Sequence, residues 1–288
     1  MQFNSPEQQA AKTAFNQLPD QQRNQMRLSS VRLTNGNFTG SGVLVKDSEN
    51  IIGIITAKHN LSVKAGIETP IQWNQNQVNE LMAGFLNGLS VGYDPQGIDQ
   101  NPQKTQALTS TNSDIEFRAG NESWDYDLMF ISFKGDLEIK QWASSNGSHR
   151  IDYPYGQVPQ FYKNTQALID KQVFVTGFGD ILNQNGQPTS PGRHPFQVRS
   201  ATVSVQTQNV LRHQNPNAYF DNVLTVTASN NTSTAPGDSG GPVFYIDRGK
   251  VYLLGATLGS NYKAGEIIDD NPIKCNNSTF LYYQGKLF

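Results

Sequence analysis

Short runs of apolar and β-branched residues follow one another along most of the chain, and Gly, Asn, Asp and Pro separate them. Runs of this length and composition are typical of β-strands, and their close spacing is typical of β-barrels. The chain is therefore predicted to be mostly β. The expected strands are residues 31–33, 42–46, 51–56, 115–118, 128–133, 172–176, 201–205, 223–227, 242–246, 251–257 and 279–283.

The first 29 residues follow a different pattern. Ser5-Pro6-Glu7-Gln8 has the form of a helical capping box with proline at the first helical position. A second short helix is predicted to start at Pro19-Asp20 and to end near Arg27. We therefore expect residues 1–29 to form a short helical extension ahead of a β-rich domain that spans residues 30–288.

Three segments between the predicted strands lack a clear pattern: residues 65–113, 144–165 and 181–197. Within the first, residues 80–86 are predicted as a short helix, although Gly84 weakens that prediction. Residues 95–113 are predicted to be an exposed loop. Long loops on a scaffold often carry specificity, and tolerated insertion at the surface is the alternative.

Composition narrows the classes of function. The chain has 288 residues, of which 36% are hydrophobic, and this supports a buried core. No apolar stretch approaches the roughly 20 residues of a membrane span. Nucleic acid is a poor candidate partner, because the net charge is −2 and no basic stripe is present. The Cys and His spacing matches no zinc site, so we expect neither a metal nor a cofactor.

Residues 237–242 read Gly-Asp-Ser-Gly-Gly-Pro, and this hexapeptide points to nucleophilic chemistry at Ser239. A serine hydroxyl attacks well only when a base takes its proton and backbone N–H groups receive the developing charge. The glycines let a substrate carbonyl reach the backbone, and Gly237 can adopt the dihedrals that aim two amides at one oxygen. A glycine-rich turn between strands is the alternative.

Two further motifs precede this serine in the chain. Thr56-Ala57-Lys58-His59 ends a predicted strand, and Asp125-Tyr126-Asp127 opens an apolar one. The order His, Asp, Ser is one of several that triad enzymes use. With these motifs the chain resembles the trypsin/chymotrypsin-like serine proteases. The resemblance spans roughly residues 30–265 and includes Gly40–Leu44 and Val175–Gly179.

The resemblance implies a fold and an activity. The fold is all-β, with two six-stranded antiparallel β-barrels, the first at about residues 30–135 and the second at about 165–288. The activity is hydrolysis of peptide bonds through an acyl-enzyme. The resemblance gives Ser239 the role of nucleophile and His59 that of general base. Asp127 would orient the histidine, the N–H groups of Gly237 and Ser239 would form the oxyanion hole, and Asp238 would support the oxyanion loop.

The acid has one alternative, Asp125, because residues two apart on a strand face the same side. Asp127 is preferred, since the apolar run follows it directly. The remaining histidines, His149, His194 and His213, lie in polar stretches and are predicted at the surface, although His194 could also line the cleft.

Activation departs from the family pattern. Many members are cut before Ile-Val-Gly-Gly, and the freed amine pairs with the acid that Asp238 matches. That sequence is absent here. Because an unpaired buried carboxylate is costly, we expect Asp238 to pair with another cation, with backbone N–H groups, or with an amine made by cleavage elsewhere. The full chain is predicted to be active without the usual processing.

The resemblance also implies a substrate pocket, whose residues are assigned by their positions relative to Ser239 in the sequence. Ser233 matches the pocket base, and Thr257, Leu258 and Gly259 match its wall, so a neutral or apolar residue is expected before the scissile bond. Glu266, on the following loop, is the alternative that would restore a preference for basic residues.

The cysteine count and the N-terminal sequence bear on the type of organism and the compartment in which the protein acts. A single cysteine, Cys275, allows no intrachain disulfide, which favours a bacterial-type enzyme or a reducing compartment. We expect a secreted or exported bacterial protein. A cytoplasmic protein is the alternative, because the N-terminus lacks the form of a signal peptide. We expect a monomer that acts on protein or peptide substrates. An esterase on the same site and a catalytically silent binding protein are the other classes considered.

Overall fold

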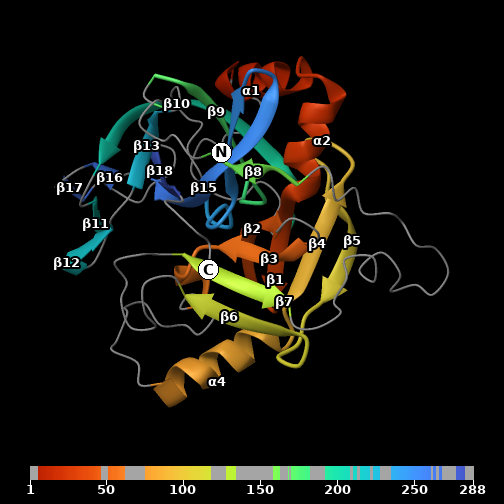
Figure 1. Cartoon of the computed structure of the whole chain (residues 1–288), viewed down its shortest axis with the longest axis vertical. Coiled ribbons are helices and arrows are strands. Elements are labelled where there is room, and N and C mark those ends of the chain that lie inside the picture. The colour runs from red at the N-terminus through yellow and green to blue at the C-terminus, as the bar shows by residue number, and fades with distance from the viewer. Residues whose placement is uncertain are drawn as a thin grey trace.

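The computed structural model describes residues 6–46, 51–61, 75–117, 128–133, 158–162, 168, 170–181, 192–207, 210–212, 215–220, 223–227, 235–260, 262–263, 266–267 and 277–282. These residues form two β-sheet bodies side by side, with helices α1 and α2 at one end of the molecule and helix α4 at the opposite end (Figure 1). Among them, no helix is long and apolar enough to cross a membrane.

The first body is a curled antiparallel sheet of seven strands in the order β5-β4-β1-β2-β3-β7-β6. Its core is apolar and includes Leu33, Leu44, Ile54 and Ile131, together with Phe85 from α4. The strands are β1 (Ser30–Asn35), β2 (Phe38–Lys46), β3 (Ile51–Thr56), β4 (Ser90–Pro95), β5 (Pro102–Ala107), β6 (Ser113–Phe117) and β7 (Met129–Phe133), and α4 spans Gln75–Leu86.

The second body is a closed barrel of six antiparallel strands, because β14 pairs with both β9 and β15. The order is β14-β9-β10-β13-β18-β15, and β8 adds to β15 in parallel. The strands are β8 (Gln160–Phe161), β9 (Gln172–Gly177), β10 (Gln197–Thr207), β13 (Val223–Thr227), β14 (Pro242–Asp247), β15 (Lys250–Ser260) and β18 (Asn277–Tyr282). Two short hairpins, β11 (Val210–Arg212) with β12 (Asn215–Phe220) and β16 (Tyr262–Lys263) with β17 (Glu266–Ile267), stand beside it.

The predicted double-barrel architecture is confirmed, and two details differ from the prediction. The first sheet has seven strands rather than six, since the polar strand β5 joins it, and β8 adds a parallel strand outside the six antiparallel strands of the second barrel. The exposed loop predicted at residues 95–113 is wrong, because β5 and the start of β6 lie there. The side chains of β5 alternate between half-buried and exposed, so this edge strand carries no apolar run that would reveal it.

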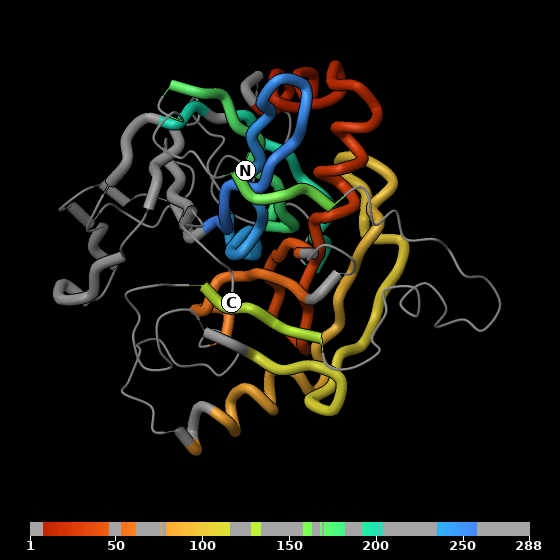
Figure 2. Tube along the Cα trace, in the orientation of Figure 1, coloured from red at the N-terminus to blue at the C-terminus, as the bar shows by residue number. Residues whose placement is uncertain are grey.

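The helical extension is present as α1 (Pro6–Asn16) and α2 (Asp20–Ser29). Figure 2 shows this N-terminal segment running over the second barrel and then into the first sheet. Phe15 of α1 is 3% exposed and meets the rings of Phe174 and Phe196 edge-on, at centroid distances of 6.1 and 6.3 Å. Gln8 Nε2 donates to Val198 O in β10 at 3.4 Å. The extension is therefore packed into the barrel core.

Replacing Phe15 by Ala should destabilise the protein by about 3–5 kcal/mol, because a buried aromatic side chain is removed and leaves a cavity. Thr13→Ala on the exposed side of the same helix should change stability by no more than about 0.5 kcal/mol. Urea unfolding of the two variants beside the original chain measures both. Equal stability of the two variants would show that α1 contributes little to the core.

Candidate active site

The turn that carries Ser239 is built from residues 235–241, between β13 and β14. Asp238 N–H donates to Ala235 O at 2.9 Å, and Gly241 N–H donates to Asp238 O at 2.8 Å, so the turn folds back on itself. Gly237 and Gly240 have φ values of +91° and +83°, which glycine adopts without steric cost.

Gly240 is also required by space. A Cβ atom at this position would lie 2.1 Å from Thr56 Oγ1 and 2.4 Å from Ser41 O, both in the first barrel. The turn therefore sits directly against β2 and the end of β3. Ser41 N–H donates to Ser239 O at 3.0 Å, and Ser41 Oγ donates to Gly237 O at 2.7 Å. Ser41, which is fully buried, thus ties the nucleophile turn of one barrel to the other.

His59 starts the helical turn that follows β3, and its side chain is half-buried, as is that of Ser239. Its neighbour Asn60 donates from Nδ2 to Ser239 O at 3.1 Å. The structure therefore brings the segment of the predicted base and the segment of the predicted nucleophile together at the junction of the two barrels.

The other predicted site residues are placed only in part. Asp127, the alternative acid Asp125 and the pocket residue Ser233 lie outside the described residues. Thr257 is buried under the nucleophile turn: its N–H donates to Gly241 O and its carbonyl accepts from Gly240 N–H, both at 2.7 Å. Leu258 and Gly259 continue the same strand, β15.

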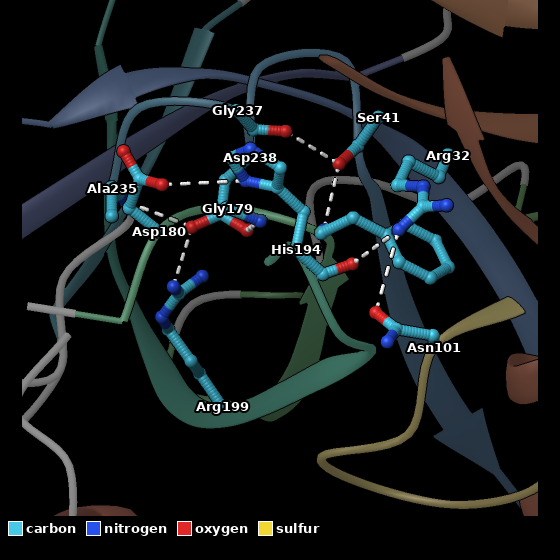
Figure 3. Close-up of polar contacts among 11 residues, drawn as sticks. Arg32, Ser41, Asn101, Gly179, Asp180, His194, Arg199, Ala235, Gly237 and Asp238 are labelled. Atoms are coloured by element: carbon cyan, nitrogen blue, oxygen red, sulfur yellow. Dashed lines mark hydrogen bonds and ion pairs between the residues drawn. The ribbon is translucent and has the colours of Figure 1, made fainter. Parts of the chain in front are cut away.

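Asp238 is fully buried, and its carboxylate accepts three hydrogen bonds (Figure 3). Arg199 Nη2 donates to Oδ2 at 2.5 Å, Ala235 N–H donates to Oδ2 at 2.8 Å, and Gly179 N–H donates to Oδ1 at 2.9 Å. Arg199, in β10, is 1% exposed. Of the three partners expected for Asp238, the structure thus supplies two, a cation and backbone N–H groups.

The glycines of Val175–Gly179 make room for this carboxylate. A Cβ atom at Gly177 would lie 2.4 Å from Asp238 Oδ1, and one at Gly179 would lie 2.5 Å from Asp238 Cγ. The Gly-x-Gly pattern that marks this segment in the sequence is therefore explained by the side chain of Asp238.

A histidine and a carboxylate lie next to the same turn. His194 Nδ1 is 3.3 Å from Asp180 Oδ1, and Asp180 N–H donates to Pro236 O at 2.8 Å. Both side chains are half-buried, with 17% of the His194 side chain and 18% of the Asp180 side chain exposed. The surface position predicted for His194 is therefore only partly correct, because the polar sequence around it gives no sign that it packs against Asp180. Arg32 Nη1 donates to the carbonyl of His194 at 3.2 Å.

Burial controls the charge of this pair. Burial lowers the pKa of His194, the cation of Arg32 lowers it further, and the nearby Asp180 and Asp238 carboxylates only oppose the shift. Burial also raises the pKa of Asp180, against the influence of His194. Elsewhere among the described residues, no cluster of three His, Cys, Asp or Glu side chains could hold a metal ion.

Comparison with known families matches residues 93–269 to the trypsin family, which is more than half of the chain. The chain belongs to the trypsin family. Among solved structures, this trypsin-family chain is similar to the scabies mite inactivated protease paralogue S-I1, with 11% identity, 92% of each chain covered and a TM-score of 0.51. At that identity the likeness shows the fold alone. The comparison with curated proteins found no match.

Replacing Arg199 by Met should destabilise the protein by about 3–5 kcal/mol, because it leaves the buried Asp238 carboxylate without its cation. The double variant Arg199→Met/Asp238→Asn removes both charges and should recover a large part of that loss. Urea unfolding measures both variants. A single variant as stable as the original chain would contradict a charged Asp238 that depends on Arg199.

The contribution of His194 to stability should fall as the pH is lowered from 7 to 5. An unfolded histidine titrates near 6.5, whereas burial holds the folded pKa of His194 lower, so the unfolded chain binds more protons in this window. Asp180 acts in the opposite sense, because its raised pKa stabilises the folded state at acid pH and that contribution is lost as the pH rises. His194→Gln should make the melting temperature less dependent on pH between 7 and 5, and identical slopes would show that His194 titrates normally.

Proposed function

We propose that this chain is a serine endopeptidase that cleaves peptide bonds through an acyl-enzyme on Ser239. The observation that carries the proposal is the junction of the barrels, where the turn of Ser239 is hydrogen-bonded to the residue after His59. A catalytic base and nucleophile must be held in productive geometry by rigid elements that packing and hydrogen bonds fix in place. Both side chains are half-buried rather than enclosed, so a substrate can reach them.

Asp127 is proposed as the acid of the triad. In the antiparallel pairing of β3 with β7, Thr56 lies opposite Met129. The strand that follows Asp127 in the sequence therefore starts beside the end of the strand that leads to His59. This register supports an acid from the sequence just before β7 acting on His59, with Asp125 as the alternative.

The oxyanion hole is proposed to consist of the N–H groups of Gly237 and Ser239. The peptide between Gly237 and Asp238 is held by Ser41 Oγ on its carbonyl, and Asp238 is held by Arg199. Donors that are fixed before the reaction stabilise the developing oxyanion without reorganisation. The rigid turn is therefore suited to this role.

The Arg199–Asp238 pair supports activity without N-terminal processing. In the family pattern a freed amine neutralises the acid that Asp238 matches, and here a guanidinium from β10 occupies that role. We propose that the full chain is active as made. The residue before the scissile bond is proposed to be neutral or apolar, with Ser233, Thr257, Leu258 and Gly259 around it.

A silent binding protein is the second candidate, since the structurally similar scabies mite protein is an inactivated protease paralogue. In this chain His59 and Ser239 are both present at the junction, and this favours the enzyme. An esterase acting on the same serine would show itself by a preference for simple esters over peptides.

The purified full chain should cleave a peptide library, and Ser239→Ala or His59→Ala should remove most of a contribution on the order of 10⁶-fold. Asp127→Asn should be severe and Asp125→Asn mild.

Reaction of Ser239 with a fluorophosphonate separates the candidate functions. Labelling without peptide cleavage would favour the esterase, and no labelling of the full chain would favour the binding protein. Activity found only after trimming near Arg27 would contradict a chain that is active as made.

A further inference from the structure

Asn60 follows the predicted base and is 2% exposed, yet it carries a polar side chain. Its Nδ2 donates to Thr56 Oγ1 at 2.8 Å and to Ser239 O at 3.1 Å. A primary amide has two N–H donors, and here one is directed to the first barrel and the other to the nucleophile turn. A buried amide with both donors used in this way is costly to replace.

The two bonds of Asn60 close a ring of hydrogen bonds. Thr56 Oγ1, which accepts from Asn60, donates to Ser41 O at 2.6 Å. Ser41 N–H then donates to Ser239 O, the same carbonyl that Asn60 reaches. The ring therefore joins β2, the end of β3, the turn of His59 and the turn of Ser239. Both lone pairs of the Ser239 carbonyl are occupied by the first barrel.

The ring fits because glycines surround it. A Cβ atom at Gly40 would lie 3.0 Å from Asn60 Nδ2 and 2.8 Å from the Phe38 ring, and one at Gly240 would lie 2.1 Å from Thr56 Oγ1. One glycine comes from β2 and the other from the nucleophile turn. The sequence thus leaves space for this amide on both sides of the junction.

We infer that Asn60 is a positioning residue for the proposed hydrolysis, because its side chain fixes the His59 turn against the Ser239 turn. The inference rests on the proposed function. The hydrogen bonds of Asn60 go to the hydroxyl of Thr56 and to the backbone carbonyl of Ser239 rather than to the reacting hydroxyl. Asn60 thereby sets the distance over which the serine proton passes to His59. Small errors in such a distance lower the reaction rate strongly, since a misplacement of about 1 Å can reduce it on the order of 10²-fold.

The test compares Asn60→Ala and Asn60→Asp with matched variants of Asn35 in the full chain. Asn35 is 7% exposed and lies in the same barrel. Its Nδ2 donates to the backbone carbonyl of Phe85, a residue of α4, at 2.8 Å. Asn35→Ala and Asn35→Asp therefore remove a buried amide of the same kind from a place outside the site. Melting temperature, kcat, KM and the rate of fluorophosphonate labelling are measured for all four.

Both Asn60 variants should lower kcat and the labelling rate by about 10- to 100-fold and leave KM within about twofold, since only the approach of base and nucleophile is disturbed. Asn60→Asp keeps the volume of the side chain but aims an oxygen at the Ser239 carbonyl. It therefore tests the loss of the Nδ2 hydrogen-bond donors even where Asn60→Ala folds poorly. Both Asn35 variants should lower the melting temperature and leave kcat and labelling unchanged.

Asn60 variants that label and turn over at the original rate, or that raise KM alone, would overturn the positioning role. Equal losses of kcat in the Asn35 variants would overturn it too, because they would reveal a general effect of stability. If the original chain itself neither labels nor cleaves, the proposed function fails first, and the role of Asn60 fails with it.

Discussion

The buried ion pair between Arg199 and Asp238 is the constraint on which the site depends. A carboxylate removed from water must be neutralised and hydrogen-bonded, and here one guanidinium and two backbone N–H groups do this. The same contacts fix Ala235 and Gly179 on either side of the turn. The position of Ser239 therefore depends on how the charge of the preceding residue, Asp238, is buried.

The pair also links the site to the N-terminal helices. Arg199 follows Val198 in β10, and the carbonyl of Val198 accepts from Gln8 of α1. Phe196, on the same segment, packs against Phe15. The helical extension thus supports the strand that supplies the cation. The sequence Ile-Val-Gly-Gly is absent from this chain, and the positive charge beside Asp238 comes from the guanidinium of Arg199 in β10.

The sequence predicted the parts of the molecule that are encoded locally. The helices, the apolar strands and the two motifs around His59 and Ser239 have short-range signals, and the strand at the end of the chain was expected where β18 lies. The sequence did not reveal Arg199 as the partner of Asp238. A single charged residue next to a predicted strand is expected at the surface, and only the placement of that strand in the barrel shows that it is buried. The strand β5 was missed because its polar edge has no apolar period, and the burial of His194 depends on segments far away in the sequence. The acid, Asp127, lies outside the described residues and stays a prediction.

The burial of Asn60 has a consequence for how the protein can be produced. Asn60-Leu61-Ser62 is an acceptor sequence for N-linked glycans. In the folded chain the amide is enclosed and both its N–H groups are engaged, so a sugar cannot be attached there. In a eukaryotic secretory pathway, where glycosylation precedes completion of folding, a glycan at this position would block the junction of the barrels. For recombinant production, a host that does not glycosylate asparagine is therefore the suitable choice.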